Sequence, residues 1–245
     1  MNPTKRAFKI TGGLLIVFGI ILGFLLSSVM VWGDLEGSLF TTGLRPDKSL
    51  STLRCPIIIT NSETGIIYAT LNNPTQKTLE RYLIANISEG YATLVREIRT
   101  DLPIPPEEKQ KVEWKISPKD AAFEQRVILF RVFINPRYPY PSLGGDCGVV
   151  KLNIQGVTGN QLVGIAALLS FVSIGFGTGM VEYGIRPNKG RSRSALNSVY
   201  ALVGIVIGSG ILGYLGFWVP GLVLLAISAI MILVIVAKKL GGENS

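Results

Sequence analysis

The 245-residue chain carries 24 Lys and Arg against 16 Asp and Glu, giving a net charge of +8, and its mean hydropathy of +0.42 is too high for an ordinary soluble domain. It contains no histidine, which excludes Ser–His–Asp and Cys–His nucleophiles, histidine zinc sites and histidine-ligated haem. Its two cysteines cannot form a structural zinc site alone. The carboxylate and lysine chemistry that remains has no recognisable pattern. We therefore expect no enzyme, no cofactor and no metal.

The excess of positive charge is confined to three short stretches, because acidic and basic residues nearly balance between Asp34 and Lys151. Each stretch flanks a hydrophobic run: Lys5, Arg6 and Lys9; Arg186, Lys189, Arg191 and Arg193; and Lys238 and Lys239. Basic residues beside apolar runs set the orientation of membrane helices. We therefore expect membrane lipids and a protein partner or second copy of the chain as partners, and no nucleic acid.

The first apolar run, residues 10–32, follows a basic segment at residues 1–9 and contains no charge. A helix rises 1.5 Å per residue, so this run exceeds the ~30 Å hydrocarbon core of a bilayer. A cleaved secretory signal peptide is the alternative. The run is longer than the roughly 7–15 residues usual for a signal core, which favours an uncleaved membrane anchor.

Residues 33–54 are polar and poorly periodic, and we expect an extended linker outside the cytosol. From there to residue 157 the apolar residues recur with the period of two that is typical of strands. The predicted strands are Pro56–Thr60, Glu63–Asn72, Thr78–Ser88, Ala92–Arg99, Lys109–Ser117, Arg126–Asn135 and Gly148–Gln155. Short strands with regular turn signals and no convincing amphipathic helix predict an all-β sandwich over residues 55–157.

Asp120-Ala121-Ala122-Phe123 precedes the most apolar of these strands. With that corner, the segment Cys55–Gln155 resembles the immunoglobulin and fibronectin-III class of modules, a likeness that concerns the fold and implies no function. In that class the first strand commonly runs parallel to the last. The resemblance therefore brings Cys55 and Cys147 together as a disulfide; two buried free thiols are the alternative.

A proline-rich loop, Pro136–Asp146, precedes the last predicted strand, and we expect it at the end of the β domain farthest from the membrane. Its Arg137, Tyr138 and Tyr140 make it a candidate interaction loop, because aromatic residues and arginine are enriched at protein interfaces. The alternative is a long turn whose aromatic side chains only cover the end of the core. Asn86-Ile87-Ser88 is a glycosylation sequon within a predicted strand.

Three further apolar runs, residues 161–183, 198–217 and 219–237, are each long enough to cross a membrane. A basic loop at residues 184–197 separates the first two, and a tight turn separates the last two. A cytosolic N-terminus places all three basic stretches, including the tail at residues 238–245, in the cytosol and the β domain outside it. We expect a multi-pass protein of the plasma membrane.

Pairs of small residues at a spacing of four predict close helix packing: Gly19 and Gly23, Gly175 and Gly179, and Gly204 and Gly208. The alternative is that glycine is simply frequent in membrane helices. Apart from Glu182, at the cytosolic edge of the second span, no charged residue lies within a predicted span, which argues against a pump or coupled transporter.

The predicted fold is thus α+β by segment, with four transmembrane helices arranged as one plus three and a β-sandwich inserted after the first. The favoured function is a non-enzymatic membrane protein that displays this sandwich for protein interaction, as an accessory subunit, scaffold or surface module. A channel or transporter component is the first alternative, and an enzyme using carboxylates of the outer domain is the second.

Overall fold

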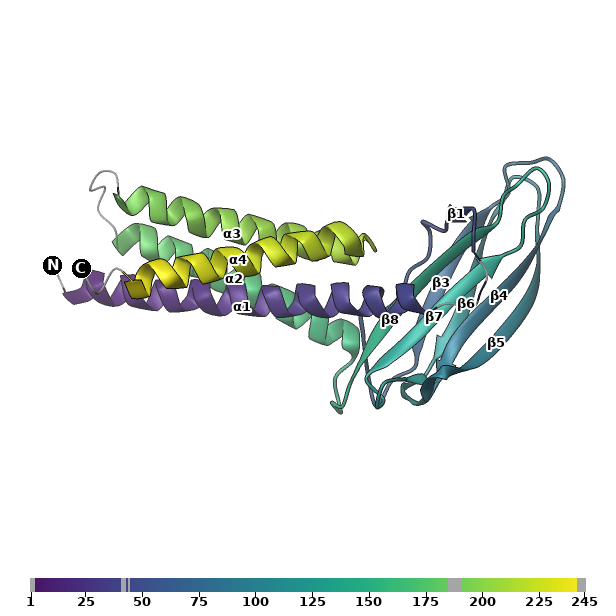
Figure 1. Ribbon diagram of the computed structural model, residues 1–245, viewed down its shortest axis with the longest axis horizontal. Helices are drawn as coiled ribbons and strands as arrows, with labels where there is room; N and C mark the ends of the chain where they lie inside the picture. The colour runs from purple at the N-terminus through teal and green to yellow at the C-terminus, as the bar shows by residue number, and fades with distance from the viewer. Residues whose placement is uncertain (1–2, 41–42, 44, 185–190, 242–245) are drawn as a thin grey trace. The chain divides into compact units, whose positions relative to one another are not determined.

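The computed structural model describes residues 3–40, 43, 45–184 and 191–241 (Figure 1). The chain is α+β, with four described helices, a mixed sheet and a second, antiparallel sheet. Contacts divide it into two units, Trp32–Leu162 and residues 1–31 with 163–245, which we describe separately. In chain order the elements are α1 (Pro3–Leu39), β1 (Lys48–Ser49), β2 (Ile58–Thr60), β3 (Gly65–Asn72), β4 (Leu79–Glu89), β5 (Tyr91–Ile104), β6 (Lys109–Ile116), the 3₁₀ helix η1 (Pro118–Asp120), β7 (Val127–Ile134), β8 (Leu143–Leu152), α2 (Gly159–Gly184), α3 (Arg191–Tyr214) and α4 (Trp218–Gly241).

Two sheets make up the unit Trp32–Leu162. The larger has six strands in the order β1-β8-β7-β4-β5, with β2 also pairing to β8, and the smaller pairs β3 with β6. Both β1 and β2 run parallel to β8, whereas the other neighbours are antiparallel. Every predicted strand overlaps a strand of the structure, and the first predicted strand does run parallel to the last.

The sheets pack their inner faces into one core. The alternation in β6 places Val112, Trp114 and Ile116 inside, where the Trp114 ring lies 5.2 Å from that of Phe130 in β7. The opposite face of β6 is charged and exposed. Inner faces of this kind stabilise a domain by removing apolar surface from water, at roughly 25 cal/mol per Å².

Strand β7 is buried on both of its faces, as its nearly continuous apolar sequence predicts. Ile128 and Phe130 point into the core between the sheets. Val127 and Leu129 point the other way and form a small second cluster with Phe40, which follows α1. The outer face of β7 is therefore covered by the chain just before the β domain.

Helix α1 continues to Leu39, so the prediction of an extended linker from residue 33 is wrong for its first seven residues. This end of α1 packs on β8 with direct backbone contact, since a Cβ added to Gly37 would lie 2.3 Å from the carbonyl carbon of Cys147. Gly33 makes the same kind of contact with Gly148 one turn earlier. The two glycines are spaced for a helix that needs no side chain on the face toward the sheet.

Strand β8 begins at Leu143, five residues before its predicted start, so the loop before it is shorter than Pro136–Asp146. Gly144 and Gly145 resemble turn residues in the sequence but pair with β7. They are small because the linker crosses them: a Cβ on Gly144 would lie 2.6 Å from Pro46, and one on Gly145 would lie 2.8 Å from Leu53.

In the helical unit, the part of α1 that belongs to it, up to Val31, packs against α2 and α3. The Ser170 hydroxyl donates a 2.8 Å hydrogen bond to the Gly19 carbonyl, and Ser27 donates one of 3.4 Å to the Val206 carbonyl. Ile16, Ile20 and Val206 belong to the apolar core of this unit. The start of α1, the end of α2, the start of α3 and the end of α4 all lie at the same end of the unit (Figure 1).

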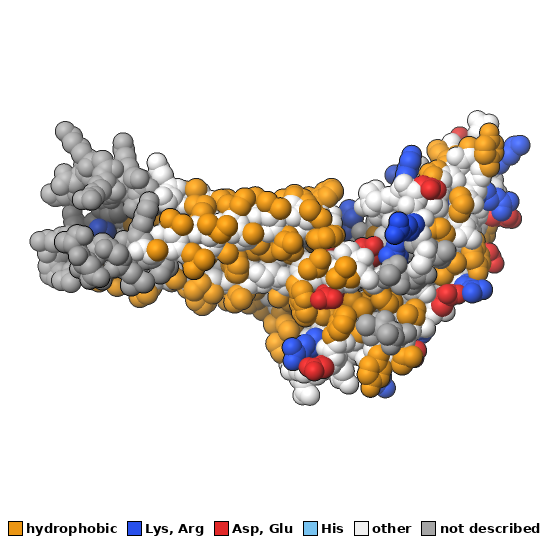
Figure 2. Space-filling view, viewed as in Figure 1, with side chains coloured by type: hydrophobic (Ala, Val, Ile, Leu, Met, Phe, Trp, Pro, Cys, Tyr) orange, Lys and Arg blue, Asp and Glu red, His pale blue; other side chains and the backbone are white. Residues whose placement is uncertain are grey.

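Three described helical segments are long and apolar enough to cross a membrane, judged by length and composition: Ala7–Leu39, Gly159–Tyr183 and Asn197–Tyr214. The apolar segment described in α4, Trp218–Val234, is shorter than these. Figure 2 shows hydrophobic side chains covering the visible face of the described helices, whereas charged side chains are spread over the β domain. This distribution is compatible with membrane insertion of the helices.

Candidate interaction site

The two ends of the β domain are built from different loops. We call "tip" the end formed by residues 73–78, 105–108 and 135–142, where β3, β5 and β7 end and β4, β6 and β8 begin. We call "base" the opposite end, formed by residues 61–64, 90, 121–126 and 153–158. The candidate interaction loop of the sequence lies at the tip.

Asn73 holds the tip loops together from a fully buried position. Its side-chain amide donates to the carbonyls of Lys77, Ile104 and Pro105 at 2.8–2.9 Å. Its carbonyl oxygen accepts from the backbone N–H and the hydroxyl of Thr75. One side chain thus satisfies backbone groups of two loops, which fixes both loops against β5.

The loop at residues 135–142 closes on itself through a pair of backbone hydrogen bonds. The Arg137 N–H donates to the Tyr140 carbonyl at 3.1 Å, and the Tyr140 N–H donates to the Arg137 carbonyl at 2.6 Å. The Tyr138–Pro139 peptide bond between them is cis. This narrow turn places Tyr138 at its outermost point.

Two arginines set how the three predicted site residues lie. Arg137 forms an ion pair of 3.2 Å with Glu80, at the start of β4. Arg81 is buried, donates to the Asn135 carbonyl, and places its guanidinium 5.3 Å from the centre of the Tyr140 ring. Burial lowers the pKa of Arg81, and the neighbouring Tyr140 opposes that shift. Tyr140 is therefore a half-buried structural residue of the loop.

Tyr138 is 97% exposed, so it does not cover the core. Tyr140 is instead half-buried against Arg81, so the two tyrosines of the loop differ in their surroundings. An exposed aromatic ring on a turn fixed by its own backbone loses little conformational entropy on binding.

A second polar contact fixes the point where the loop enters β8. The Asp47 carboxylate accepts hydrogen bonds from the Ser142 hydroxyl at 2.7 Å and from its backbone N–H at 3.0 Å. These bonds lower the pKa of Asp47. The linker is thereby attached to the start of β8, beside the pairing of Lys48 with Leu143.

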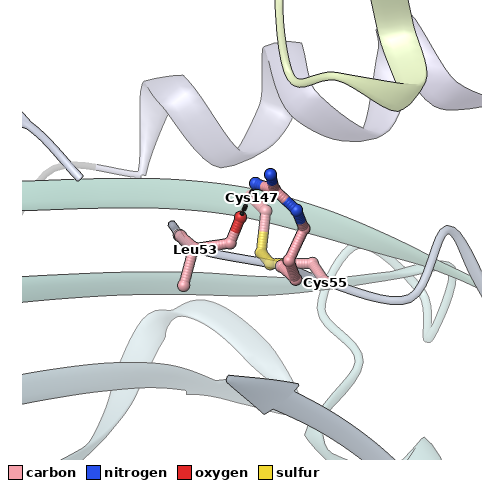
Figure 3. The surroundings of a disulfide bond; sticks show 4 residues. Leu53, Cys55 and Cys147 are labelled. Carbon is pink, nitrogen blue, oxygen red and sulfur yellow. Dashed lines mark hydrogen bonds between the residues drawn. A yellow bond between two sulfur atoms is a disulfide. The ribbon is translucent and has the colours of Figure 1, made fainter. Parts of the chain in front are cut away.

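The structure contains a Cys55–Cys147 disulfide, whose Cα atoms lie 6.6 Å apart (Figure 3). Cys147 is in the middle of β8 and faces the core, and Cys55 precedes β2. The cysteines are separated by 92 residues, for which the loop-entropy model gives about 4–5 kcal/mol. The disulfide attaches the linker to the centre of β8 and so supports both ends of the domain.

The predicted packing glycines fall into two groups. Gly19 and Gly23 are at contacts: a Cβ on Gly19 would lie 2.7 Å from Ile174, and one on Gly23 would lie 3.0 Å from Ser170. Gly175, Gly179 and Gly204 have no neighbouring heavy atom within 4 Å of such a Cβ, and Gly208 has only an ordinary contact with Leu224. Gly12 and Gly177 pack closely instead, a contact that the four-residue spacing does not identify.

Most of the predicted orientation charges cannot be placed. Arg186 and Lys189 lie outside the described residues, and the side chains of Lys5, Arg6, Arg191, Arg193, Lys238 and Lys239 are not described; Lys9 is exposed.

The sequon asparagine, Asn86, is only 3% exposed within β4, so the folded domain leaves no room for a glycan there. Among the described residues, no group of three or more His, Cys, Asp or Glu could hold a metal ion.

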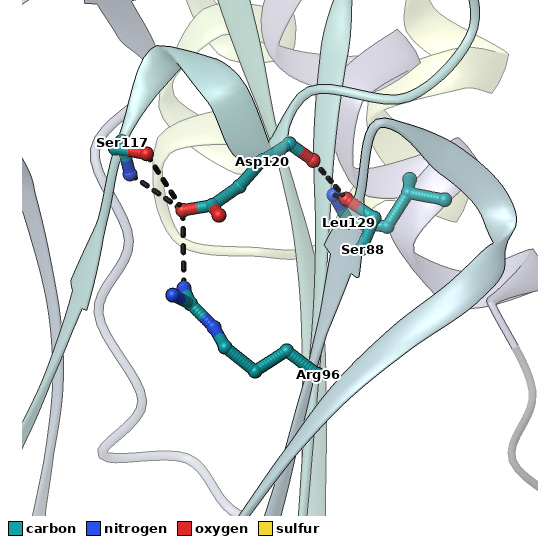
Figure 4. Close-up of polar contacts among 5 residues, drawn as sticks. All are labelled: Ser88, Arg96, Ser117, Asp120 and Leu129. Carbon is teal, nitrogen blue, oxygen red and sulfur yellow. Dashed lines mark hydrogen bonds and ion pairs between the residues drawn. The ribbon is translucent and has the colours of Figure 1, made fainter.

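No local sequence pattern predicts the polar network at the base (Figure 4). The buried Asp120 carboxylate accepts from the Ser117 backbone N–H at 2.7 Å and pairs with Arg96 of β5 at 3.1 Å. The Asp120 carbonyl accepts from the Ser88 hydroxyl, whose oxygen in turn accepts from the Leu129 N–H. This network joins β4, β5 and β7 to the turn that follows η1.

Comparison with known proteins gives no family. No protein-family model and no curated protein matches the sequence. Among solved structures, the CARDB domain of a Pyrococcus furiosus protein in complex with di-metal ions overlaps 46% of this chain and all of that chain, at 10% identity and a TM-score of 0.31. Bacteroides uniformis β-glucuronidase 2 overlaps 40% of this chain but only 12% of its own, at 11% identity and a TM-score of 0.29. Neither overlap assigns a function to this chain.

Proposed function

We propose that the chain is a non-enzymatic integral membrane protein that presents an immunoglobulin-like β-sandwich for protein interaction, as an accessory subunit, scaffold or surface module. The observation that carries the proposal is Tyr138, which is 97% exposed on a turn braced by Arg137, Tyr140 and their partners. Rigid, exposed tyrosines beside arginine are typical of protein contact surfaces. The partner is another protein or a second copy of the chain.

The proposed topology has four transmembrane helices in the plasma membrane, with both termini in the cytosol and the β domain outside. It is supported by the apolar helices and by the position of the start of α1, the end of α2, the start of α3 and the end of α4 at one end of their unit. In the sequence, the three basic stretches adjoin these four helix ends. The disulfide is compatible with an oxidising compartment for the β domain.

Co-purification in a mild detergent tests the interaction. We expect the full-length protein to recover a stable partner or a homo-oligomer, and Tyr138→Ala to reduce that recovery by about tenfold, as loss of an interface hot spot does. The matched control is Ile66→Ala, which removes an apolar side chain that is 46% exposed on β3, in neither the tip nor the base. Equal loss in both variants, or a clean monomer for the parent protein, contradicts the proposal.

Lysine labelling tests the topology. An amine reagent that does not cross membranes, applied to intact cells, should modify Lys48 and Lys77 of the β domain. Lys189 and Lys238 should react only after the membrane is permeabilised. Peptide mass spectrometry separates these sites, and the reverse pattern would overturn the orientation.

A further inference from the structure

The base of the β domain carries large apolar side chains that no other part of that domain covers, within the residues described. Tyr91 is 69% exposed at the β4–β5 turn, and Leu94, nearby in β5, is 54% exposed. Phe123 is 46% exposed in the turn after η1, and Ile154, just after β8, is 38% exposed. The strand register brings these four side chains to the same end of the domain.

The turn that carries Phe123 is held in an unfavourable backbone conformation. Phe123, Glu124 and Gln125 have φ angles of +48°, +58° and +64°, in the left-handed region that side chains other than glycine rarely adopt. Residues in this region cost about 1 kcal/mol or more each, and they persist only where surrounding structure holds them. The Asp120 network and the Ala122–Val127 bridge supply that support here. The structure thus holds an aromatic ring outward at the expense of local stability.

The same end of the domain is joined rigidly to the start of α2. The Gly159 N–H, in the first turn of that helix, donates a 2.6 Å hydrogen bond to the Glu63 carboxylate, which also accepts from the Thr60 N–H. Thr158 and Gln161 form a capping box across the helix start. A carboxylate at a helix N-terminus is also favoured by the helix dipole. The first turn of α2 is therefore a part of the base.

Helix α2 is the apolar segment Gly159–Tyr183, and so it enters a bilayer almost directly from the base. Ile154 is only five residues before Gly159, a distance of at most about 18 Å along an extended chain. Two cations flank the Phe123 turn: Arg126, which pairs at 3.2 Å with Glu124 of the turn, and Lys151, whose ammonium group donates to Gln125. Aromatic rings with Lys or Arg beside them are characteristic of the headgroup region, where rings are buried and cations reach phosphate.

We infer that the base of the β domain rests on the lipid surface, with Phe123, Tyr91 and Leu94 in the headgroup region of the leaflet that α2 enters. The occupant of this apolar surface is the membrane itself, because the base holds the first turn of the apolar helix α2 through Glu63. This inference rests on the membrane insertion of α2 in the proposed function. It adds a membrane contact at the end of the domain opposite Tyr138.

Spin labelling of the full-length protein tests this contact. Phe123→Cys and, as the matched control at the tip, Tyr138→Cys are labelled under non-reducing conditions that leave the native disulfide closed. Each protein is reconstituted into vesicles of phosphatidylcholine with a minority of phosphatidylglycerol. Collision rates are then measured with oxygen, which concentrates in the bilayer, and with a water-soluble nickel chelate. Leu94→Cys provides a second base label should the Phe123 variant fold poorly.

We expect the ratio of oxygen to nickel collisions to be at least severalfold higher at position 123, and at position 94, than at position 138. Free access of the nickel chelate to both base labels would overturn the inference by placing the base in water. Shielding from both reagents would also overturn it, because a protein would then cover the base. A parent protein that an alkaline carbonate wash removes from vesicles is not inserted at all, an outcome that contradicts the proposed function separately.

Discussion

The tip and the base of the β domain each close one end of the two packed sheets, and they do so in opposite ways. At the tip a buried amide, Asn73, satisfies the loop carbonyls, and Tyr138 projects outward from a neighbouring turn. At the base a buried carboxylate, Asp120, lies beside a turn with left-handed φ angles that exposes Phe123. This difference is the one expected if the tip meets a protein partner and the base lies beside lipid, as we propose.

The first way to test this comparison is to remove the carboxylate at the base. Asp120→Ala should destabilise the β domain by about 3 kcal/mol, because it deletes three hydrogen bonds and leaves the Ser117 N–H without its partner. We place it below the range for fully buried ion pairs because the Arg96 side chain is 41% exposed. Urea-dependent hydrogen exchange of the full-length protein in detergent gives the free energy of unfolding.

Asp120→Asn is the matched control for that change. It keeps the shape and part of the hydrogen bonding, so it should cost less than half as much as the alanine variant. If Asp120→Ala costs under about 1 kcal/mol, the network does not hold the turn, and the strain at Phe123 needs another source of support.

The second prediction concerns the buried amide at the tip. Asn73→Ala should cost about 2 kcal/mol, since three backbone carbonyls each lose a hydrogen bond, that of Ile104 in a buried place. Its exposed neighbour provides the control, because Asn72→Ala should change stability by less than about 0.5 kcal/mol. Hydrogen exchange should speed up first in residues 73–78 and 105–108. Faster exchange at the base alone would show that the two ends are not independent.

The sequence predicts the strands far better than it predicts these two ends. The clean alternation of Lys109–Ser117 and the apolar run of β7 report directly which faces are buried. The hydrogen bonds of Asn73 and Asp120 join residues of which some lie more than twenty positions apart, and no local pattern marks them. A glycine in the sequence usually indicates where a left-handed φ angle occurs. The turn at residues 123–125 has three such angles but contains no glycine.

Glycines in the sequence lead to two wrong structural predictions, a turn and a linker, for the same physical reason. Gly144 and Gly145 resemble a turn, and Gly33 and Gly37 precede what resembles a linker, yet all four allow backbone or side chains to come close to β8 or to the helix that covers it. Whether a glycine allows a close approach depends on the segment that packs against it, and the sequence does not show which segment that is. The sequence predicts the candidate site only as a loop, since the different burial of Tyr138 and Tyr140 depends on Arg81 from another strand.

The third prediction relieves the strain at the base. Glu124→Gly should leave the β domain equally stable or stabilise it by up to about 1 kcal/mol, because glycine adopts a φ of +58° without steric cost. Lys119→Gly is the control: it is an exposed position nearby with an ordinary φ, and it should lose roughly 0.5–1 kcal/mol. Chemical denaturation of both variants checks the difference. A loss at position 124 as large as that at 119 would mean that the turn carries no strain.

The smallest effect is a pH dependence at the tip. The hydrogen bonds from Ser142 lower the pKa of Asp47 in the folded state, so the unfolded chain binds its proton more readily. The stability that Asp47 contributes is therefore present above the unfolded pKa of about 3.9 and is lost as the pH falls toward the folded value. Asp47→Asn should slightly destabilise the domain at neutral pH and flatten the loss of stability below about pH 4.

Asp146, in the middle of β8, is the control of opposite sign. Burial raises the pKa of this carboxyl, and Arg131 only partly opposes the shift, so its ionisation works against folding as the pH rises above about 4. Asp146→Asn should therefore lessen the fall in stability between acidic and neutral pH, whereas Asp47→Asn should lessen the fall at the acidic end. Denaturation of both variants across this pH range measures the two slopes. Identical slopes in the two variants would mean that neither carboxyl differs from one in water.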